Sequence, residues 1–324
     1  MKILIVGGAG MVGQKLAARL AVDGRLGNQD ISELTLFDVV PADQPAAGFR
    51  INVATGDISE MSTSAELVAS QPDVIFHLAA IVSGEAEADF DKGYRINLDG
   101  TRHLFDAVRV IPNYVPRIVF TSSIAVFGAP FPDSIPDDFH NTPLTSYGTQ
   151  KTIGELLLND FTRRGTMDGI SIRLPTICVR PGRPNKAASG FFSNIIREPL
   201  AGHEAVLPVD DSVRHWHASP RAAVEFLRHA ATIDGAELGN RRSLTLPGIS
   251  VTVGEQIEAL RRIAGDKVVA RIRRQPDEAI TQMVSGWPQR FNATRAQALG
   301  FKAEQSFDEI IKVHLEDELK GIIR

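Results

Sequence analysis

Short apolar runs alternate with longer amphipathic segments along the first half of the chain. Continuous apolar runs are typical of strands covered on both faces of a parallel sheet. The segments between them show helical patterns. The runs cover residues 3–6, 34–37, 74–77, 118–121 and 170–174, and the helical patterns cover residues 11–22, 62–70, 90–110 and 147–164. The pattern predicts an α/β fold, a doubly wound Rossmann sheet of parallel strands with helices on both faces.

This alternation ends near Pro175. Gly and Pro become frequent beyond that point, and a cluster of basic residues follows it. Further along, residues 252–263 and 307–319 show amphipathic helical patterns. A second, smaller lobe is therefore expected to begin there.

The length of 324 residues corresponds to about two domains. We expect residues 1–175 to form a Rossmann domain that binds a cofactor, with residues 214–240 returning to it. Residues 176–213 and 241–324 are expected to form a smaller C-terminal α/β lobe that binds the substrate.

Composition excludes several classes of protein. The chain is 43% hydrophobic and 23% charged, close to the globular average, which excludes collagenous and disordered chains. A net charge of −4 lacks the positive excess of nucleic-acid and membrane-surface binders, so neither partner is expected. The single cysteine, Cys178, forms no internal disulfide, which favours a reducing compartment. Because no apolar stretch is long enough for a signal peptide or a membrane span, we expect a cytoplasmic protein.

A glycine-rich loop joins the first strand to the first helix. Gly7, Gly8, Gly10 and Gly13 fit either Gly-x-Gly-x-x-Gly or Gly-x-x-Gly-x-x-Gly spacing. Glycines at such a junction allow a tight turn and a close approach of the backbone to a pyrophosphate, which the helix N-terminus attracts. An ordinary glycine-rich turn is the alternative, but the position between a buried strand and a helix favours a dinucleotide site.

Asp38 ends the second predicted strand, where an acid binds the adenosine ribose hydroxyls in dinucleotide sites. It lies 25 residues beyond Gly13, and a polar loop accounts for the extra length. The residues after it, Val39, Val40 and Pro41, provide no cation. A lone carboxylate repels a 2′-phosphate, so the sequence predicts NAD over NADP.

Tyr147 is the one tyrosine of three that has a lysine four residues later, at Lys151. Positions four apart share a helix face. A phenol has a pKa near 10, and a neighbouring ammonium favours the phenolate, so such a pair can provide a general base. The alternative is a surface pair on a helix.

Several further segments resemble segments of the extended short-chain dehydrogenase/reductase family, the NAD-dependent epimerases and dehydratases, and they occur in the same order as in that family. The resemblance runs from Lys2 to about Pro220. The segments are Gly56-Asp57-Ile58, His77-Leu78-Ala79-Ala80, Asn97-Leu98-Asp99-Gly100-Thr101, Thr121-Ser122-Ser123-Ile124-Ala125-Val126-Phe127-Gly128 and Arg173-Leu174-Pro175-Thr176-Ile177.

The resemblance implies NAD-dependent oxidation of a secondary alcohol. It places the catalytic serine at Ser123, which would hydrogen-bond the hydroxyl, with Ser122 as the alternative. It makes Tyr147 the base, while Lys151 lowers the pKa of that phenol and binds the nicotinamide ribose. The residues expected to bind NAD are Gly7, Gly10, Met11, Val12, Gly13, Asp38, Asp57, Ile58, Leu78, Ala79, Ala80, Asn97, Ser122, Tyr147, Lys151, Pro175 and Ile177.

The chain departs from the epimerase pattern after Arg180, where the usual nucleotide-binding segment is missing. The cations there suit a compact sugar acid better than a uracil base, and an Arg fork matches a carboxylate. The candidates for binding the carboxylate or hydroxyls are Ser83, Arg180, Arg183, Asn185 and Lys186. Solvated surface charge is the alternative for each.

Other interpretations remain open at this point. One is a nucleotide-sugar epimerase or dehydratase that retains NAD, and another is a non-catalytic NAD sensor or scaffold. His215 and His217 alternate as strand neighbours on one face, but no third ligand lies at a useful spacing, so no metal is expected. The family resemblance also implies a homodimer, through helices at residues 90–110 and 147–164 of each copy.

Overall fold

The computed structural model describes residues 1–182 and 189–324, and these residues form two compact units. The first unit comprises Met1–Val126, Thr145–Leu174 and Val224–Thr245. The second comprises Phe127–Leu144, Pro175–Ala223 and Leu246–Arg324.

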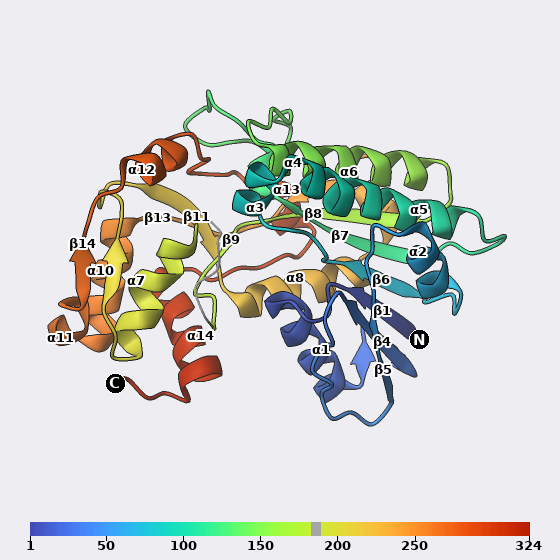
Figure 1. Ribbon diagram of the computed structural model, residues 1–324, viewed down its shortest axis with the longest axis horizontal. Helices are drawn as coiled ribbons and strands as arrows, with labels where there is room; N and C mark the ends of the chain where they lie inside the picture. The colour runs from blue at the N-terminus through green and yellow to red at the C-terminus, as the bar shows by residue number, and fades with distance from the viewer. Residues whose placement is uncertain (183–188) are drawn as a thin grey trace. The chain divides into compact units, whose positions relative to one another are not determined.

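A seven-stranded sheet, parallel throughout, forms the centre of the first unit (Figure 1). Its order is β12-β8-β7-β6-β1-β4-β5. The strands are β1 (Lys2–Val6), β4 (Glu33–Asp38), β5 (Arg50–Thr55), β6 (Val74–His77), β7 (Arg117–Ser123), β8 (Asp168–Leu174) and β12 (Ser243–Thr245). From β1 the sheet continues through β4 to β5 on one side and from β6 through β7 to β8 on the other, so the order of the strands reverses between β1 and β6. In sheets of this kind, ligands bind at the carboxyl ends of the strands beside this point. The predicted Rossmann fold is confirmed.

Helices cover the sheet because their apolar faces match its buried strands. Leu104 and Phe105 of one helix and Leu158 of another pack with Leu4 and Phe120 of the sheet, and all five are at most 1% exposed. The helices of this unit are α1 (Met11–Asp23), α2 (Met61–Val68), α3 (Ser83–Ala88), α4 (Phe90–Gly93), α5 (Gly100–Arg109), α6 (Ser146–Arg163), α8 (Pro220–Thr232, from Val224 on) and α9 (Gly235–Leu238). The antiparallel pair β2 (Arg25–Leu26) and β3 (Gln29–Asp30) follows α1.

The single helix expected at residues 90–110 is not continuous. A π-helical segment, η1 (Tyr94–Asp99), separates α4 from α5. Gly100 follows it directly, and a Cβ there would lie 3.0 Å from the Ile58 Cγ2 atom. π-helical turns are frequent at functional sites, and this one carries Asn97.

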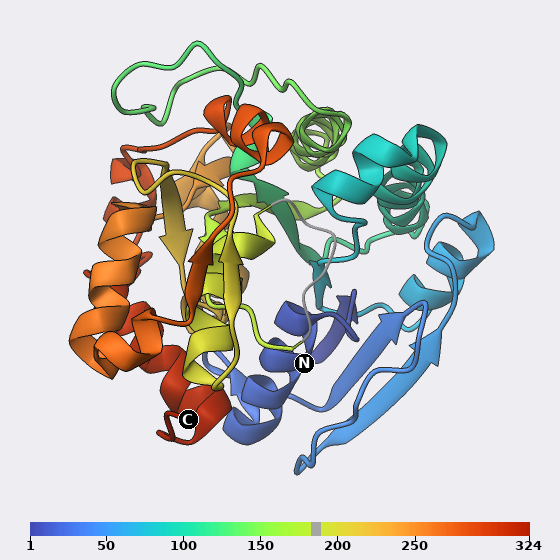
Figure 2. The same cartoon turned by 60° about the vertical axis from the view of Figure 1, so that its left-hand side comes forward.

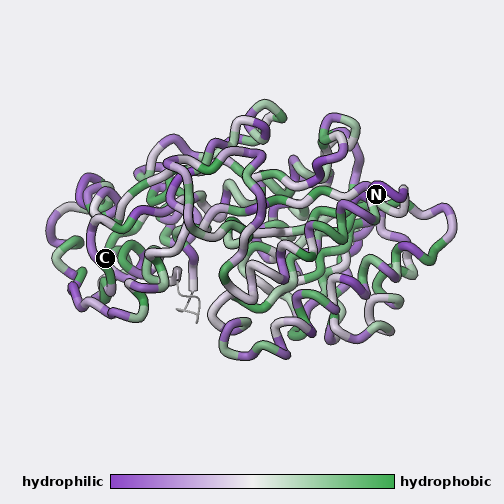
Figure 3. The backbone as a smooth tube through the Cα atoms, turned by 90° about the horizontal axis from the view of Figure 1, so that it is seen from above, coloured by the Kyte–Doolittle hydropathy of each residue, from purple (hydrophilic) through white to green (hydrophobic). Residues whose placement is uncertain are grey.

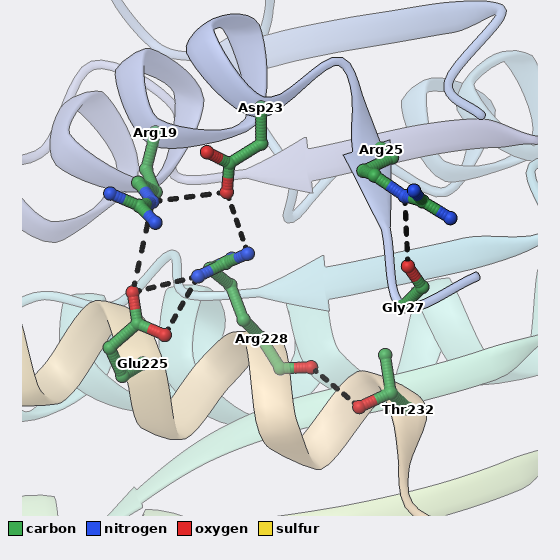
Figure 4. A network of polar contacts seen from close by, with 7 residues as sticks. All are labelled: Arg19, Asp23, Arg25, Gly27, Glu225, Arg228 and Thr232. Atoms are coloured by element: carbon green, nitrogen blue, oxygen red, sulfur yellow. Dashed lines mark hydrogen bonds and ion pairs between the residues drawn. The ribbon is translucent and has the colours of Figure 1, made fainter. Parts of the chain in front are cut away.

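Ion pairs connect α1 with α8 (Figure 4). The Asp23 carboxylate accepts from Arg19 Nε at 3.0 Å and pairs with Arg228 Nη2 at 2.6 Å, and Arg228 also pairs with Glu225. The side chains of Asp23 and Arg228 are 18% and 20% exposed, so this pair is better shielded than a surface pair, for which about 0–1 kcal/mol is typical. The network fixes α8 against α1 on the first unit.

Short sheets and three longer helices build the second unit (Figure 2). Phe192, Ile195, Ile257, Ile310 and Ile311 are at most 3% exposed and form its apolar core. The sheets are β13-β11-β9 (Ile249–Thr252, Arg214–Ala218, Thr176–Ile177) and β10-β14 (Ala205–Leu207, Ile272–Arg274). The helices are α7 (Gly190–Leu200), α10 (Val253–Ala264), α11 (Asp266–Val269), α12 (Glu278–Ser285), α13 (Thr294–Ala298) and α14 (Phe307–Leu319).

The second unit includes Phe127–Leu144, which the sequence places in the first domain. Ile135 explains the difference, because its backbone pairs with that of Arg290 and Asn292, and the Phe127 ring lies 5.6 Å from that of Phe291. The return to the first unit begins at Val224, later than the expected residue 214, since β11 pairs with β13 and β9 of the second unit.

Polar and apolar residues alternate along the helices, as Figure 3 shows. Among the helices of residues 1–182 and 189–324, none has the length and apolar character needed to cross a bilayer.

Candidate active site

The backbone of the glycine loop after β1 packs so tightly that two of its glycines have no space for a side chain. Gly7 has φ +97°, and a Cβ there would lie 2.6 Å from the Ala79 amide nitrogen. A Cβ on Gly13 would lie 2.2 Å from the Gly7 carbonyl oxygen. Gly10 differs, since a Cβ there would meet that oxygen at an ordinary 3.4 Å. The protein itself therefore requires glycine at positions 7 and 13, and position 10 stays open to a ligand.

The N-terminus of α1 fits a pyrophosphate. Gly10 is its N-cap and makes no side-chain cap, and the first turn contains no acidic residue. The backbone N–H groups and the positive end of the helix dipole therefore lie free of a competing carboxylate from that turn. Met11 and Val12, the first residues of α1, are partly exposed beside the loop. These residues fit the phosphate groups of a dinucleotide.

Asp38 at the end of β4 is bound to the glycine loop. One carboxylate oxygen accepts from the Ala9 amide at 2.9 Å, and the other accepts from the Val39 amide at 2.7 Å. Val39 and Val40 are 64% and 54% exposed. Asp38 thus lies at the glycine loop, as the sequence predicted. Its carboxylate oxygens have further lone pairs that can accept from ribose hydroxyls.

Asp57 makes more protein contacts than the sequence suggested. Its carboxylate accepts from the Ser59 amide and hydroxyl at 2.9 and 2.6 Å and from Arg95 Nη1 at 2.7 Å. The Ser59 hydroxyl, with weaker help from Arg95, holds the pKa of this carboxyl below its usual range, so it is an ionised acceptor at neutral pH. Ile58 beside it is 3% exposed and packs inside the unit.

Asn97 holds the loop after β6. Its side chain exchanges two hydrogen bonds with the backbone of Ile81, at 2.9 and 3.2 Å, and donates to Gln150 on α6 at 2.8 Å. Leu78 and Ala79 of the same loop donate from their amides to the Val6 carbonyl of β1. Since Asn97 is only 2% exposed, it shapes the loop that contains Leu78, Ala79 and Ala80.

Ser123 ends β7, and its side chain is partly exposed, whereas the neighbouring Ser122 is 3% exposed. The Ser122 hydroxyl donates to Glu155 at 2.5 Å. The Ser123 hydroxyl oxygen accepts from the Ala125 amide at 3.1 Å and keeps its proton available. This difference favours Ser123 over Ser122 for contact with a substrate.

Tyr147 and Lys151 lie in the first two turns of α6. The helix begins at Ser146 because the Thr145 hydroxyl caps it, accepting from the Gly148 amide at 3.1 Å. Lys151 Nζ lies 5.7 Å from the centre of the Tyr147 ring and donates to the Thr121 carbonyl of β7 at 2.8 Å. Burial lowers the pKa of Lys151 to about 7, and the Glu155 carboxylate opposes that shift. The four-residue spacing thus places the buried amine of Lys151 next to the phenol of Tyr147. The Thr121 carbonyl that accepts from this amine lies two residues before Ser123 on β7.

Of the remaining candidates that the structure describes, Arg180, Pro175 and Ile177 lie in the second unit and Ser83 lies in the first. Arg180 donates to the Ile177 carbonyl at 3.0 Å and to the Ser189 hydroxyl at 2.6 Å, and it is partly buried. Pro175 and Ile177 are buried in the same unit. Ser83, on the first unit, begins α3 and is partly exposed. Arg183, Asn185 and Lys186 lie outside the described residues.

His215 and His217 are neutral packing residues on β11. His215 donates from Nδ1 to the Pro288 carbonyl at 3.0 Å, and its Nε2 lies 2.7 Å from the Thr176 hydroxyl oxygen. Its ring stacks on Phe192, and burial lowers its pKa to about 4. The ring of His217 meets that of His215 edge to face at 5.4 Å. Within residues 1–182 and 189–324, no group of three or more His, Cys, Asp or Glu side chains is arranged to hold a metal ion.

The model of the NAD dependent epimerase/dehydratase family matches residues 3–220. The chain belongs to this family. The family confirms the expected cofactor class, and the glycine loop described above fits it.

Two relatives within the epimerase/dehydratase family match almost the entire chain. D-erythronate dehydrogenase of Cupriavidus necator is 48% identical over 322 residues, covering 98% of both chains. D-erythronate dehydrogenase of Haemophilus influenzae is 41% identical over 319 residues, covering 98% of this chain and 100% of the relative.

Two solved structures have the same fold as this chain. The crystal structure of the nucleoside-diphosphate-sugar epimerase from Agrobacterium tumefaciens matches with a TM-score of 0.98 and 63% identity, covering 100% of this chain and 96% of that one. The holo form of a GalE-like L-threonine dehydrogenase from Cupriavidus necator matches with a TM-score of 0.84 at 23% identity, covering 98% and 99%, and shows the fold alone.

Cofactor choice in this family member gives a first testable prediction. Replacing Asp38 with Asn keeps an oxygen to accept from the Ala9 amide but removes the charge that repels a 2′-phosphate. We expect the preference for NAD over NADP, measured as the ratio of the two kcat/KM values, to fall at least about tenfold, which corresponds to ~1.4 kcal/mol. The matched control is Asp43→Asn, an exposed acid on the segment after β4. An unchanged ratio in Asp38→Asn would contradict the assignment.

Proposed function

We propose that the protein is an NAD-dependent dehydrogenase that oxidises the C2 hydroxyl of D-erythronate to the 2-oxo acid. The observation that carries the proposal is the grouping of Ser123, Tyr147 and Lys151 at the carboxyl end of β7 in a chain 48% and 41% identical to two D-erythronate dehydrogenases. A non-catalytic NAD sensor or scaffold would not need such a grouping. One free, buried cysteine suits a reducing compartment such as the cytoplasm.

In the proposed mechanism each side chain has one task. Ser123 donates a hydrogen bond to the substrate oxygen and steadies the carbonyl that forms. Tyr147 removes the proton of the substrate hydroxyl, and the ammonium of Lys151 favours the phenolate that does so. Bound NAD supplies the chemistry of hydride acceptance. The substrate thus loses one proton and one hydride, and its carbon–oxygen single bond becomes a double bond.

The backbone groups of the glycine loop and α1 would hold the pyrophosphate, and Asp38 would hold the adenosine ribose. Arg180 is our candidate for binding the substrate carboxylate, because a guanidinium can bind both oxygens. Its hydrogen bonds to Ile177 and Ser189 fix its orientation in the second unit.

A second candidate function is epimerisation or dehydration of a nucleotide-linked sugar with retained NAD. It is favoured by the 63% identity to a structure described as a nucleoside-diphosphate-sugar epimerase. The two functions differ in net chemistry, since only the dehydrogenase releases NADH.

Screening four- to six-carbon aldonic acids for NADH release tests the proposal. Absorbance at 340 nm is followed with D-erythronate, L-erythronate, both threonates and larger acids, and UDP-sugars are followed for epimerisation in parallel. The expected result is NADH formation that is fastest with D-erythronate. Turnover of a nucleotide sugar without NADH from any acid would establish the second candidate instead.

We also propose that two copies of the chain form a homodimer through the helices of residues 90–110 and 147–164, which include α4 and α6. Phe90 and Leu156 are 57% and 65% exposed on these helices, which are large exposed fractions for such apolar side chains. Replacing Leu156 with Arg is expected to convert a dimer to a monomer, because it would bury an unpaired charge in the interface. Light scattering after size exclusion measures this. Val22→Arg on α1, where Val22 is 82% exposed, is the control that should leave the mass unchanged.

A further inference from the structure

Glu155 lies one helical turn beyond Lys151 on α6, and the side chains of both are buried. Each residue is 3% exposed, and positions four apart share a helix face. Lys151 Nζ donates to the carbonyl of Thr121, and Glu155 Oε1 accepts from the hydroxyl of Ser122. The amine and the carboxylate therefore contact consecutive residues of β7, directly before Ser123.

A row of polar side chains on the sheet faces Glu155. Ser122 and Arg173 are register partners on β7 and β8, and Arg173 and Thr245 are register partners on β8 and β12. Arg173 Nε and Nη2 donate to the two carboxylate oxygens of Glu155 at 2.9 and 2.7 Å, and its Nη1 donates to Thr245 at 3.5 Å. These donors fix the Glu155 carboxylate in place with charge-assisted hydrogen bonds.

The other groups facing Lys151 do little to stabilise an ammonium by charge. The rings of Phe120 and Tyr147 lie 4.8 and 5.7 Å from Nζ, and the Thr121 carbonyl of β7 accepts from it. His77 on β6 is neutral near pH 7, because burial lowers its pKa to about 3. Arg173 on β8 adds a second positive charge. Of these groups, Glu155 alone supplies a compensating negative charge.

We propose that Glu155 is a positioning residue for Lys151: its buried carboxylate, fixed by Arg173 and Ser122, keeps the lysine in the ammonium form beside Tyr147. The inference rests on the proposed function, which gives Lys151 its catalytic task. The contrasting explanation is that the Glu155–Arg173 pair only holds α6 against the sheet. The two explanations predict opposite changes in the proton affinity of Lys151.

Titration of Lys151 by NMR tests the proposal without substrate. The chain is labelled with ¹³C at the lysine ε-carbons, and the Lys151 signal is identified by its absence from the spectrum of Lys151→Met. We expect Glu155→Gln to lower the titration midpoint of Lys151 by at least one pH unit, a tenfold loss in proton affinity. Arg173→Gln is expected to raise the midpoint, because it removes a cation.

A purely structural role gives a different pattern. Loosened packing admits water, which weakens the effect of burial and raises the midpoint of Lys151 in both variants. The matched control is Asp160→Asn, which removes a negative charge from an exposed position of the same helix, where Asp160 pairs with Arg163. A rise of the midpoint in Glu155→Gln, or a change no larger than that in Asp160→Asn, would overturn the proposal.

Removing one partner of a buried ion pair can unfold a protein. The comparison is therefore repeated in the Arg173→Gln background, where no pair remains to be broken, and adding Glu155→Gln there should again lower the midpoint. Glu155→Asp, which keeps the charge, should return the midpoint toward that of the unaltered chain. If the unaltered chain oxidises no sugar acid, the proposed function fails while this titration still decides the role of Glu155.

Discussion

Replacing Tyr147 with Phe is expected to lower kcat for sugar-acid oxidation by about 10²–10⁴-fold, the usual contribution of a positioned general base. Phenylalanine keeps the ring beside Lys151 Nζ, 5.7 Å away in the structure, and removes only the oxygen that takes the proton. NADH production from D-erythronate measures kcat, and NADH fluorescence measures cofactor affinity. We expect the affinity for NADH to change much less than kcat, since the rest of the cofactor site is untouched.

Tyr94→Phe provides the matched control for this substitution. Tyr94, the first residue of η1, packs on Phe90 of α4 with ring centres 4.5 Å apart, and it has no task in the proposed mechanism. Tyr114 is a less suitable control, because its buried hydroxyl donates to the Pro72 carbonyl at 2.6 Å and its loss would cost stability. If Tyr147→Phe retained the kcat of Tyr94→Phe, the assignment of the base would be wrong.

The pH dependence of the same reaction follows from the burial of Lys151. Burial lowers the pKa of this lysine to about 7, so its ammonium gives up a proton close to neutrality and not near pH 10. A pair that has lost one proton can accept one from the substrate. Oxidation is therefore favoured as the pH rises through neutrality.

Local signals predicted the parts of this fold that depend on neighbouring residues. Five apolar runs marked buried strands, and the glycine loop and the Tyr147–Lys151 spacing located the ends of α1 and α6 within a residue. Strand β5 went unpredicted because its position at the sheet edge leaves most of its side chains exposed or half-buried, which removes the apolar run. A polar edge strand carries too little periodicity to be recognised.

Contacts between segments that are distant in the sequence could not be predicted from local patterns. The π-helical turn at Asn97 depends on packing against Ile81 and Gln150, which are 16 and 53 residues away. Glu155 follows Lys151 at helical spacing, and that spacing was the one available signal for a charge partner. Its bonds to Ser122 and Arg173 depend on the register of two strands, which no local pattern encodes.

The glycine loop gives the second large expected effect, because two of its glycines are needed for different reasons. In Gly13→Ala the new Cβ would lie 2.2 Å from the Gly7 carbonyl oxygen and 3.0 Å from the Gly8 Cα. Both are backbone atoms, so the loop must shift to accommodate it. We expect the free energy of unfolding to fall by about 1–3 kcal/mol, the range for overpacked sites, and NADH binding to be lost with the loop geometry.

Gly10→Ala separates cofactor binding from folding. A Cβ there meets no protein atom closer than 3.4 Å, an ordinary contact, so thermal unfolding should change little beyond the small cost of Ala at an N-cap. The methyl group would instead occupy the space in which a pyrophosphate approaches the backbone. Affinity for NADH, measured by fluorescence, should fall at least about tenfold, or ~1.4 kcal/mol. If Gly10→Ala bound NADH as the unaltered chain does, the loop would be a tight turn required by the fold, and the dinucleotide would have to bind elsewhere.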